Sequence, residues 1–427
     1  MQKLKYITTS AAVAFTEVRV KRLNRIQIMR RRLLQWLVCP LCHHALTLGI
    51  IVSKQQLPAE EDYQILEAIA PIEDPAQVEI DIISGVLACD ACRIYYPIYN
   101  GIPRMLVYPT RVAQLHAQEN RTWLTTHLAG FDLPQRIPPP GEQEVLRNFS
   151  TEWVGYRWTG ASYWSLTPDM VLRCKRYELG LYRRNIKHRL VLEVGIGIGG
   201  TADALSRAES CELVGMDLGY AVDQAQYYFG QNPLLHLVQA SVFAPPFRPG
   251  SFDVVYSHGV LHHTYSTRAA FTQIARLPKQ ANGMLYVWVY SHDQEQATPL
   301  RRVLMVIESG VRPVLSRLPG FWQTLFLAPA LPFYVLYQNF YRRTQLGAHV
   351  AAWYGWNEAL HAARDRLTPP FAHRHTYEEV IEWFHAEMYQ GLELLRDEQS
   401  LEGVPDTFPL NVGVRGFRRP VRSCDSV

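Results

Sequence analysis

The sequence predicts an α/β protein in which a small cysteine-rich domain precedes a doubly wound, mostly parallel sheet. Two observations carry this prediction. From residue 171 onward, short apolar runs alternate with amphipathic stretches of helical length, the pattern of a parallel sheet covered by helices on both faces. Between residues 34 and 108, two pairs of closely spaced cysteines accompany Gly and Pro punctuation, which predicts short strands and turns.

The alternation of apolar and amphipathic stretches locates the expected elements. Strands are expected at residues 189–195, 211–218, 234–241, 251–259 and 283–290. Helices are expected between them at residues 201–208, 221–229 and 268–277. We expect the chain to divide into a basic N-terminal extension (1–33), the cysteine-rich domain (34–108), a linker and aromatic cap (109–170) and the α/β domain (171–427) with an apolar insertion (298–347).

Composition is that of a globular protein with enough apolar residues for a core. Of 427 residues, 48% are hydrophobic and 19% charged, and a formal net charge of +4 gives no reason to expect a nucleic-acid partner. Close cysteine pairs without a secretory signal favour a metal site over disulfides, so we expect a cytoplasmic protein. For the basic extension two interpretations stay open: translation starts at Met29, or the extension is an arm near a membrane surface.

The most informative run is VLEVGIGIGGTA at residues 191–202. A strand ends at Val194, and the chain turns into a helix through Gly195, Gly197, Gly199 and Gly200. Glycine permits positive φ and lets a ligand approach the backbone closely. Asp217 ends the next strand, about twenty residues on, where an acidic side chain can hold ribose hydroxyls. The pattern predicts a nucleotide site, either for a dinucleotide or for S-adenosylmethionine.

A second run, FRPGSFDVVYSHGVLHHT at residues 247–264, narrows this choice. With Glu193 in an E-x-G-x-G loop, it resembles class I S-adenosylmethionine-dependent methyltransferases of the type 11 kind, close to the quinone-methylating group. The resemblance rests on three features: residues 251–253 at the start of the fourth strand, the pair His262 and His263, and the fifth-strand run GMLYVWVY. It covers about residues 191–290. It implies a Rossmann-like fold and S-adenosylmethionine as methyl donor.

The resemblance also implies the cofactor contacts. The matching positions are Glu193, Gly195, Gly197, Gly199, Asp217, Leu218, Ser241, Val242 and Ser257. The family often carries an acidic residue just after the third strand, at the adenine amino group, where this sequence has Ser241 or Val242. A serine can form hydrogen bonds but supplies no charge, so we expect backbone amides and apolar packing to hold the adenine.

Three histidines are candidates for a catalytic base. Methyl transfer is an in-line displacement, and a base is needed only when the acceptor loses a proton on attack. His262 and His263 follow the fourth strand, at the edge where such sheets bind ligands. His375 stands just before a helix that Thr376 and Glu379 start as a capping box, so a structural role is an equal alternative.

The cysteine pairs predict a structural zinc site. Cys39 and Cys42 form one C-x-x-C knuckle and Cys89 and Cys92 the other, which together offer a closed tetrahedral shell of four thiolates. With ISGVLACDACRIYYPIYNGIPRML at 83–106, the block resembles the zinc-ribbon family whose stand-alone members activate tRNA and protein methyltransferases. The resemblance implies an activator built into the chain, covering an apolar face of the α/β domain.

Three functions remain in competition. We favour methyl transfer to a small-molecule or lipid-like acceptor, on the histidine pair, the aromatic run EWVGYRWTGASYW and the apolar insertion. The alternative is a tRNA or protein methyltransferase, which the activator-like module suggests. Against this alternative, the sequence contains no N-P-P-Y-like tetrad after the fourth strand and no basic, aromatic stripe that would bind RNA. The third is a scaffold that binds the cofactor without turnover.

The insertion at 298–347 differs in character from the rest of the chain. Residues 318–341 contain no Asp, Glu, Lys or Arg, which meets the crude length criterion for a membrane-spanning helix. Prolines 319, 329 and 332 interrupt the stretch, which disfavours a span. We expect a helical lid over the active site, with an interfacial helix in peripheral contact with a membrane as the next interpretation.

Overall fold

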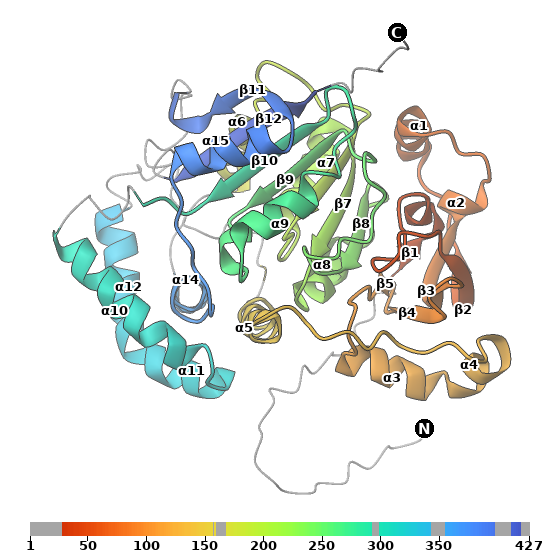
Figure 1. Cartoon of the computed structure of the whole chain (residues 1–427), viewed down its shortest axis with the longest axis horizontal. Helices are drawn as coiled ribbons and strands as arrows, with labels where there is room; N and C mark the ends of the chain where they lie inside the picture. Colours follow the sequence, from red (N-terminus) through yellow and green to blue (C-terminus); the bar gives the residue numbers. More distant parts are fainter. Residues whose placement is uncertain are drawn as a thin grey trace, which may run out of the picture.

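The computed structural model describes residues 28–156, 158, 168–292, 299–342, 355–397 and 411–419. Within these ranges a seven-stranded sheet forms the centre of the molecule and a five-stranded sheet lies beside it (Figure 1). On the other side of the centre lies a group of helices: α10 (Pro299–Leu315), α11 (Gly320–Leu327) and α12 (Leu331–Leu336). Residues 1–27, most of the expected basic extension, lie outside the described residues.

The central sheet has the order β11-β12-β10-β9-β6-β7-β8. Its strands are β6 (Leu190–Val194), β7 (Glu212–Asp217), β8 (Leu235–Gln239), β9 (Val254–His258), β10 (Met284–Val289), β11 (Tyr389–Leu394) and β12 (Val412–Arg418). Strands β6 to β10, which are the five expected strands, pair in parallel. Strand β12 pairs antiparallel with both β10 and β11. The sheet is therefore mixed and mostly parallel, as predicted.

Helices cover both faces of the sheet. Helices α6 (Pro168–Glu178), α7 (Gly200–Glu209) and α8 (Ala221–Phe229) bury apolar side chains against one face. On the other face, α9 (Thr267–Ile274) and α15 (Tyr377–Ala386) share a core with the strands. Every strand of the parallel part is buried along nearly its whole length, which explains why its sequence reads as continuous apolar runs. The predicted doubly wound class is confirmed.

The small domain is an antiparallel sheet with short helices. It contains β1 (Met29–Arg30), β2 (Thr47–Gln55), α1 (Glu60–Ile69), α2 (Ala76–Glu79), β3 (Ile80–Cys89), β4 (Ile94–Tyr99) and β5 (Ile102–Pro103). Met29 and Arg30 pair with Ile82 and Asp81 of the long strand β3. The structured domain thus begins before residue 34, and the last residues of the expected extension belong to it.

The small domain docks on edge strand β8. The Met105 amide donates to the Gln239 carbonyl at 2.8 Å, and the Val38 amide donates to the Pro246 carbonyl at 2.9 Å. Apolar side chains of both domains, among them Leu37 and Phe247, belong to one continuous core. Backbone pairing and shared burial together make the two domains one packed body in the described residues.

Two arginines of the expected extension fasten this interface. The Arg32 guanidinium is fully buried and donates to Glu212 of β7 at 2.7 Å and to the Leu66 carbonyl at 2.6 Å. Arg30 donates to the Asn232 carbonyl at 3.0 Å. Sequence alone gave these arginines no structural role, because their partners lie about two hundred residues away.

The segment between the domains consists mainly of helices. They are α3 (Arg111–Glu119), α4 (Arg121–His127) and α5 (Glu142–Gly155). The expected proline linker at 138–142 ends where α5 begins, with Gly141 in a left-handed conformation (φ 70°). Of the expected aromatic cap, Trp153 and Trp158 approach the glycine loop at Gly197 and Gly200, whereas residues 159–167 lie outside the described residues.

The apolar insertion forms short helices rather than one long one. After α12, residues Tyr337–Arg342 form a π-helical turn, and α14 (Trp356–Leu367) follows. Prolines 319, 329 and 332 stand at the starts of α11 and α12 and in the turn between them, where a missing amide hydrogen is tolerated, whereas Pro313 lies inside α10. Among the described helices, none combines the length and apolarity that a bilayer crossing requires. Helices α10 and α11 pack against α14.

The buried pair of Arg32 and Glu212 gives a stability prediction. Glu212 also contacts His236 Nε2 at 2.8 Å, and both members of the pair are fully buried. Replacing Arg32 with Met leaves a buried carboxylate without its cation, so we expect a loss of roughly 3–5 kcal/mol in the free energy of unfolding.

The measurement is denaturant unfolding of Arg32→Met beside Arg31→Met. Arg31 pairs with Asp74 at 3.1 Å on the surface, and such pairs contribute little. Equal stability of the two variants would show that the buried pair does not hold the domains together.

Candidate functional site

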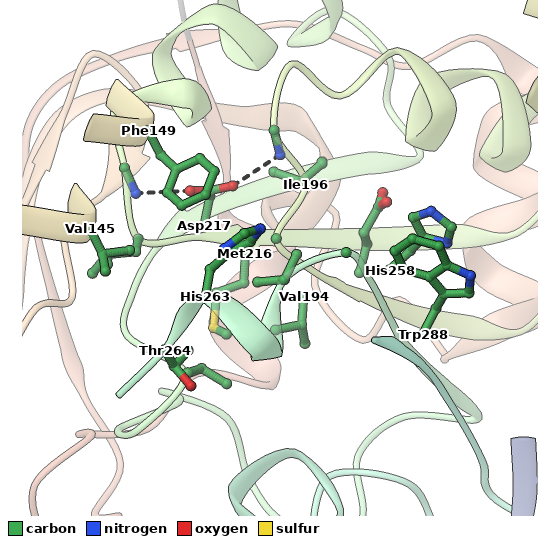
Figure 2. A pocket seen from close by; sticks show the side chains of 18 of the residues that line it. Val145, Phe149, Val194, Ile196, Met216, Asp217, His258, His263, Thr264 and Trp288 are labelled. Atoms are coloured by element: carbon green, nitrogen blue, oxygen red, sulfur yellow. Dashed lines mark hydrogen bonds between the residues drawn. The ribbon is translucent and has the colours of Figure 1, made fainter. Parts of the chain in front are cut away.

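A cavity of about 410 Å³ opens at the carboxyl ends of β6, β7, β9 and β10. This is the edge where open α/β sheets bind ligands, and the volume suits a small molecule. Its walls come from the glycine loop after β6, the ends of β7 and β10, the 3-10 turn Leu261–His263, and helices α5, α6 and α14. Figure 2 shows Asp217, Ile196 and His263 around it.

The glycine loop follows β6 as predicted. Gly195, Gly197 and Gly199 have φ values of 84°, 55° and 82°, in the left-handed region that side chains disfavour. At Gly195 a Cβ atom would lie 2.1 Å from the Val260 side chain. Both conformation and space therefore require glycine there, and Gly195 and Gly197 line the cavity.

Asp217 lies at the end of β7 and faces the cavity. Its Oδ2 accepts the Gly197 amide at 3.0 Å and its Oδ1 accepts the Gly219 amide at 2.8 Å (Figure 2). Burial raises the pKa of this carboxyl, and the two amides oppose that shift by stabilising the ionised form. The glycine loop and the acidic residue are thus fixed to each other before any ligand binds.

A group of charged residues lines the cavity beside the loop. Lys175 Nζ contacts Glu178 Oε2 at 2.5 Å, and His258 Nδ1 contacts Glu178 Oε1 at 2.9 Å. These contacts hold the pKa of Glu178 down at about 2 against the effect of its burial. For Glu193, burial raises the pKa to about 7. The E-x-G-x-G motif identifies Glu193 in the sequence. Lys175 and Glu178 could not be predicted in this way, because α6 lies outside the glycine-loop motif.

Of the other residues predicted to contact the cofactor, two line the cavity and two do not. Leu218 and Val242 line the cavity. Ser241 and Ser257 do not: Ser241 is buried and donates to Glu142 Oε2 at 2.5 Å, and Ser257 donates to the Val194 carbonyl at 3.2 Å. A carboxylate from α5, Glu142, lines the cavity instead.

His263 is the candidate histidine that lines the cavity. Its Nδ1 donates to the Phe371 carbonyl at 2.8 Å, and its Nε2 is buried with no hydrogen-bond partner among the described residues. Burial lowers the pKa of this imidazole to about 4. The ring is therefore neutral at physiological pH, with an unprotonated Nε2.

The other two histidines lie elsewhere. His262 is fully buried and stacks on Tyr290 with ring centroids 3.8 Å apart. His375 uses both ring nitrogens, with Nδ1 3.1 Å from Glu379 and Nε2 2.9 Å from Thr267 Oγ1. Of the two roles considered for His375, its contacts favour the structural one. It stands just before α15, where Thr376 and Glu379 form the expected capping box.

The rest of the cavity is largely apolar. Phe149 and Trp153 of α5, Tyr265, Trp288 and Tyr290 contribute aromatic surface. One acidic group interrupts this wall. Asp365 of α14 accepts the Tyr290 hydroxyl at 3.3 Å, and burial raises its pKa to about 6. No sequence motif marked Asp365, since its place depends on how α14 packs.

The four cysteines converge in the small domain. The Sγ atoms of Cys39, Cys42, Cys89 and Cys92 all lie within 4.8 Å of one another. The residues that follow the two knuckles, His43 and Arg93, both have positive φ (58° and 55°), so the two turns bend alike. Four thiolates at this spacing suit a tetrahedral Zn²⁺ and leave no open coordination position. None of the four cysteines lines the cavity, and the cluster fits a structural metal.

Comparison with known proteins agrees with the division of the chain into a small cysteine-rich domain and an α/β domain. Residues 192–287 match a family described as methyltransferase domain, and residues 30–101 match the Trm112p-like protein family. The chain joins a Trm112p-like domain to a methyltransferase domain. Both resemblances stated from the sequence are thereby confirmed. The methyltransferase match begins inside β6 and ends in β10, so it contains the glycine loop, Asp217 and His263.

Relatives in sequence are sterol methyltransferases. The chain is 26% identical over 174 residues to sterol 24-C-methyltransferase of Kluyveromyces lactis. The matched segment covers 38% of this chain and 47% of that protein. It is 30% identical over 177 residues to the enzyme of Schizosaccharomyces pombe, which covers 38% and 46%. The chain thus spans less than half the length of these relatives.

Solved structures with some likeness include two methyltransferases. A Haemonchus contortus phosphoethanolamine N-methyltransferase 2 has a TM-score of 0.33 and 13% identity over 57% of this chain and 52% of its own. A Haloferax volcanii complex of the Trm112 activator with a putative methyltransferase has a TM-score of 0.33 and 14% identity, covering 59% of this chain and 93% of that chain.

The cysteine cluster predicts one bound zinc per chain. Replacing Cys42 with Ala removes one of four thiolates, so we expect the purified variant to lose its zinc and to unfold at a lower temperature. Elemental analysis and thermal unfolding measure both effects. Cys211→Ala is the control, because Cys211 is buried in the methyltransferase domain, outside the cluster. Full zinc content in Cys42→Ala would contradict a four-cysteine site.

Proposed function

We propose that the protein transfers the methyl group of S-adenosylmethionine to a small, lipid-like acceptor. The observation that carries the proposal is the cavity itself. The glycine loop, Asp217 and a group of charged side chains line it together with several aromatic side chains. A polar nucleoside and an apolar acceptor can therefore meet in one cavity.

The residues present fit S-adenosylmethionine part by part. Asp217 can accept the ribose hydroxyls. The ligand's amino-acid part carries an ammonium and a carboxylate, and the cavity offers both signs of charge in Glu193 and Lys175. Leu218 and Val242 supply apolar surface for the base. The cofactor, when bound, supplies an electrophilic methyl group.

His263 is our candidate for the base. An acceptor that loses a proton on attack needs an unprotonated group in the cavity, and His263 Nε2 is one. The hydrogen bond from Nδ1 to the Phe371 carbonyl fixes the ring and its tautomer. Residues of α5 and α14 wall the cavity, which restricts the acceptor and helps to align it with the methyl group.

A lipid-like acceptor is favoured over tRNA or protein. The aromatic side chains that line the cavity suit an apolar molecule, and the relatives named above are sterol methyltransferases. The Trm112p-like domain is the observation that keeps the alternative in view. In this chain the domain packs on β8 and shares its core, which is a sufficient role without a macromolecular substrate.

We also propose that helices α10 to α12 rest on an anionic lipid surface. Of the 21 exposed large hydrophobic side chains among the described residues, twelve lie between residues 299 and 342, including Phe321, Phe326 and Phe333. This stretch contains five arginines and one acidic residue, Glu308, which pairs with Arg366. Exposed apolar side chains in a stretch whose sequence carries surplus positive charge suit the interface of an anionic membrane.

Asp217 provides the first test of the function. Asp217→Asn keeps the size of the side chain but loses its charge, so we expect affinity for S-adenosylmethionine to fall about 10- to 100-fold. Calorimetric titration of the folded, zinc-loaded protein measures this. Asp169→Asn is the control, since Asp169 is exposed and pairs with Arg173 at 3.0 Å. Absence of binding by the unaltered protein would overturn the proposal.

His263 gives a prediction for activity and its pH dependence. With a lipid acceptor, His263→Ala should lower kcat about 10²- to 10⁴-fold, whereas His375→Ala should change kcat little. Since the pKa of His263 is about 4, its basic form persists well below neutral pH. With S-adenosylmethionine saturating, so that the ammonium of the bound ligand keeps Glu193 ionised, kcat/KM for the acceptor should therefore stay level from about pH 8 to about pH 5. A midpoint near 6 would indicate Asp365 instead.

Membrane contact is tested with vesicles of phosphatidylcholine and phosphatidylserine. Replacing Phe321 and Phe326 with Gln should lower the bound fraction about tenfold, and salt should weaken binding of the unaltered protein. The control replaces exposed Leu57 and Ile137 of other surfaces with Gln. Equal binding by both double variants, or self-association of the protein through this face in gel filtration, would contradict lipid docking.

A further inference from the structure

Glu142 is a buried carboxylate that lines the cavity beside Leu218 and Val242, the residues proposed above to contact the adenine. It lies outside every sequence motif and family match described above. It is the first residue of α5, only 5% exposed, and lines the cavity. Its Oε1 accepts the Tyr108 hydroxyl at 2.9 Å and its Oε2 accepts the Ser241 hydroxyl at 2.5 Å. Two donors from different parts of the chain therefore hold this side chain in one position.

The location follows from the order of the strands. The glycine loop follows β6, and Asp217 ends the neighbouring β7, so a nucleoside with its ribose at Asp217 directs its base toward β8. Leu218 and Val242 line this end of the cavity together with Glu142. Strand β8 is the edge of the sheet, and the Trm112p-like domain docks there.

Ser241 is buried and does not line the cavity in this structure. Its one hydroxyl hydrogen goes to Glu142, and its oxygen accepts the Phe243 amide at 3.2 Å. The polar group that remains at this end is the Glu142 carboxylate. An ionised carboxylate only accepts hydrogen bonds and has about four acceptor positions, of which two are used here.

We propose that Glu142 recognises the exocyclic amino group of adenine and that Tyr108 positions it. The inference rests on the proposed function, because it assumes that S-adenosylmethionine is the ligand. An acceptor-only group favours an amino donor and disfavours the carbonyl oxygen that hypoxanthine carries at the same position. Glu142 is thus a specificity residue for the base.

The positioning residue belongs to the Trm112p-like side of the molecule. Tyr108 is buried and follows directly on the segment that pairs with β8 through Met105. The Gln239 side chain of the same strand donates to the Leu218 carbonyl at 3.0 Å, next to the cavity. The zinc-bearing domain would then help to form the base site and would not merely cover an apolar face.

The test compares two ligands, S-adenosylhomocysteine and its 6-oxo analogue S-inosylhomocysteine, by calorimetric titration of the full chain. The unaltered protein should prefer the amino compound at least tenfold. Glu142→Gln should abolish that preference, since its amide group can donate to the oxo compound. Tyr108→Phe should reduce the preference several-fold while zinc content is unchanged. Glu144→Gln, two residues along the same helix and outside the cavity wall, should behave like the unaltered protein.

Ser241→Ala separates the two candidate contacts. If Glu142 reads the base, this variant keeps a clear preference for the amino compound; if Ser241 does, the preference disappears. An unchanged ratio in Glu142→Gln would overturn the inference while the methyltransferase proposal stands. If Glu142→Gln does not fold, an unchanged ratio in Tyr108→Phe overturns the role of this pair. Failure of the unaltered protein to bind either ligand would remove both proposals.

Discussion

The docking of the Trm112p-like domain on edge strand β8 is the constraint on which much of the molecule depends. An edge strand exposes backbone groups that need partners, and here the Met105 amide satisfies the Gln239 carbonyl. The chain after β8 then turns back under the small domain, where the Val38 amide meets Pro246. The loop that carries Ser241 and Val242 lies between these two contacts. One wall of the cavity is therefore set by the interface between the domains.

Sequence predicted most of the fold because its signals are local. The five parallel strands are buried apolar runs, and glycines with positive φ mark the loop after β6. The cysteine knuckles are equally local. The antiparallel addition of β11 and β12 was not predicted, and Tyr389 to Leu394 is partly exposed, which weakens any apolar signal.

The candidate site was predicted only in part, for a physical reason. Gly195 and Asp217 belong to motifs in which spacing fixes geometry. Glu142, Glu178 and Asp365 come from helices α5, α6 and α14, which reach the cavity only through tertiary packing. Ser241 shows the converse case, a residue in the expected position whose hydroxyl is turned to Glu142. Pattern identifies the strand ends, while the surrounding helices decide which side chains face the ligand.

The continuous core has a consequence for how the two domains stay associated. An activator on a separate chain binds by mass action, so its occupancy depends on its concentration and on competing partners. A tethered module has a high effective concentration that dilution does not alter. With Arg32 buried against Glu212 across the interface, dissociation would also uncover an unpaired charge. The two domains are therefore present in a one-to-one ratio from synthesis onward.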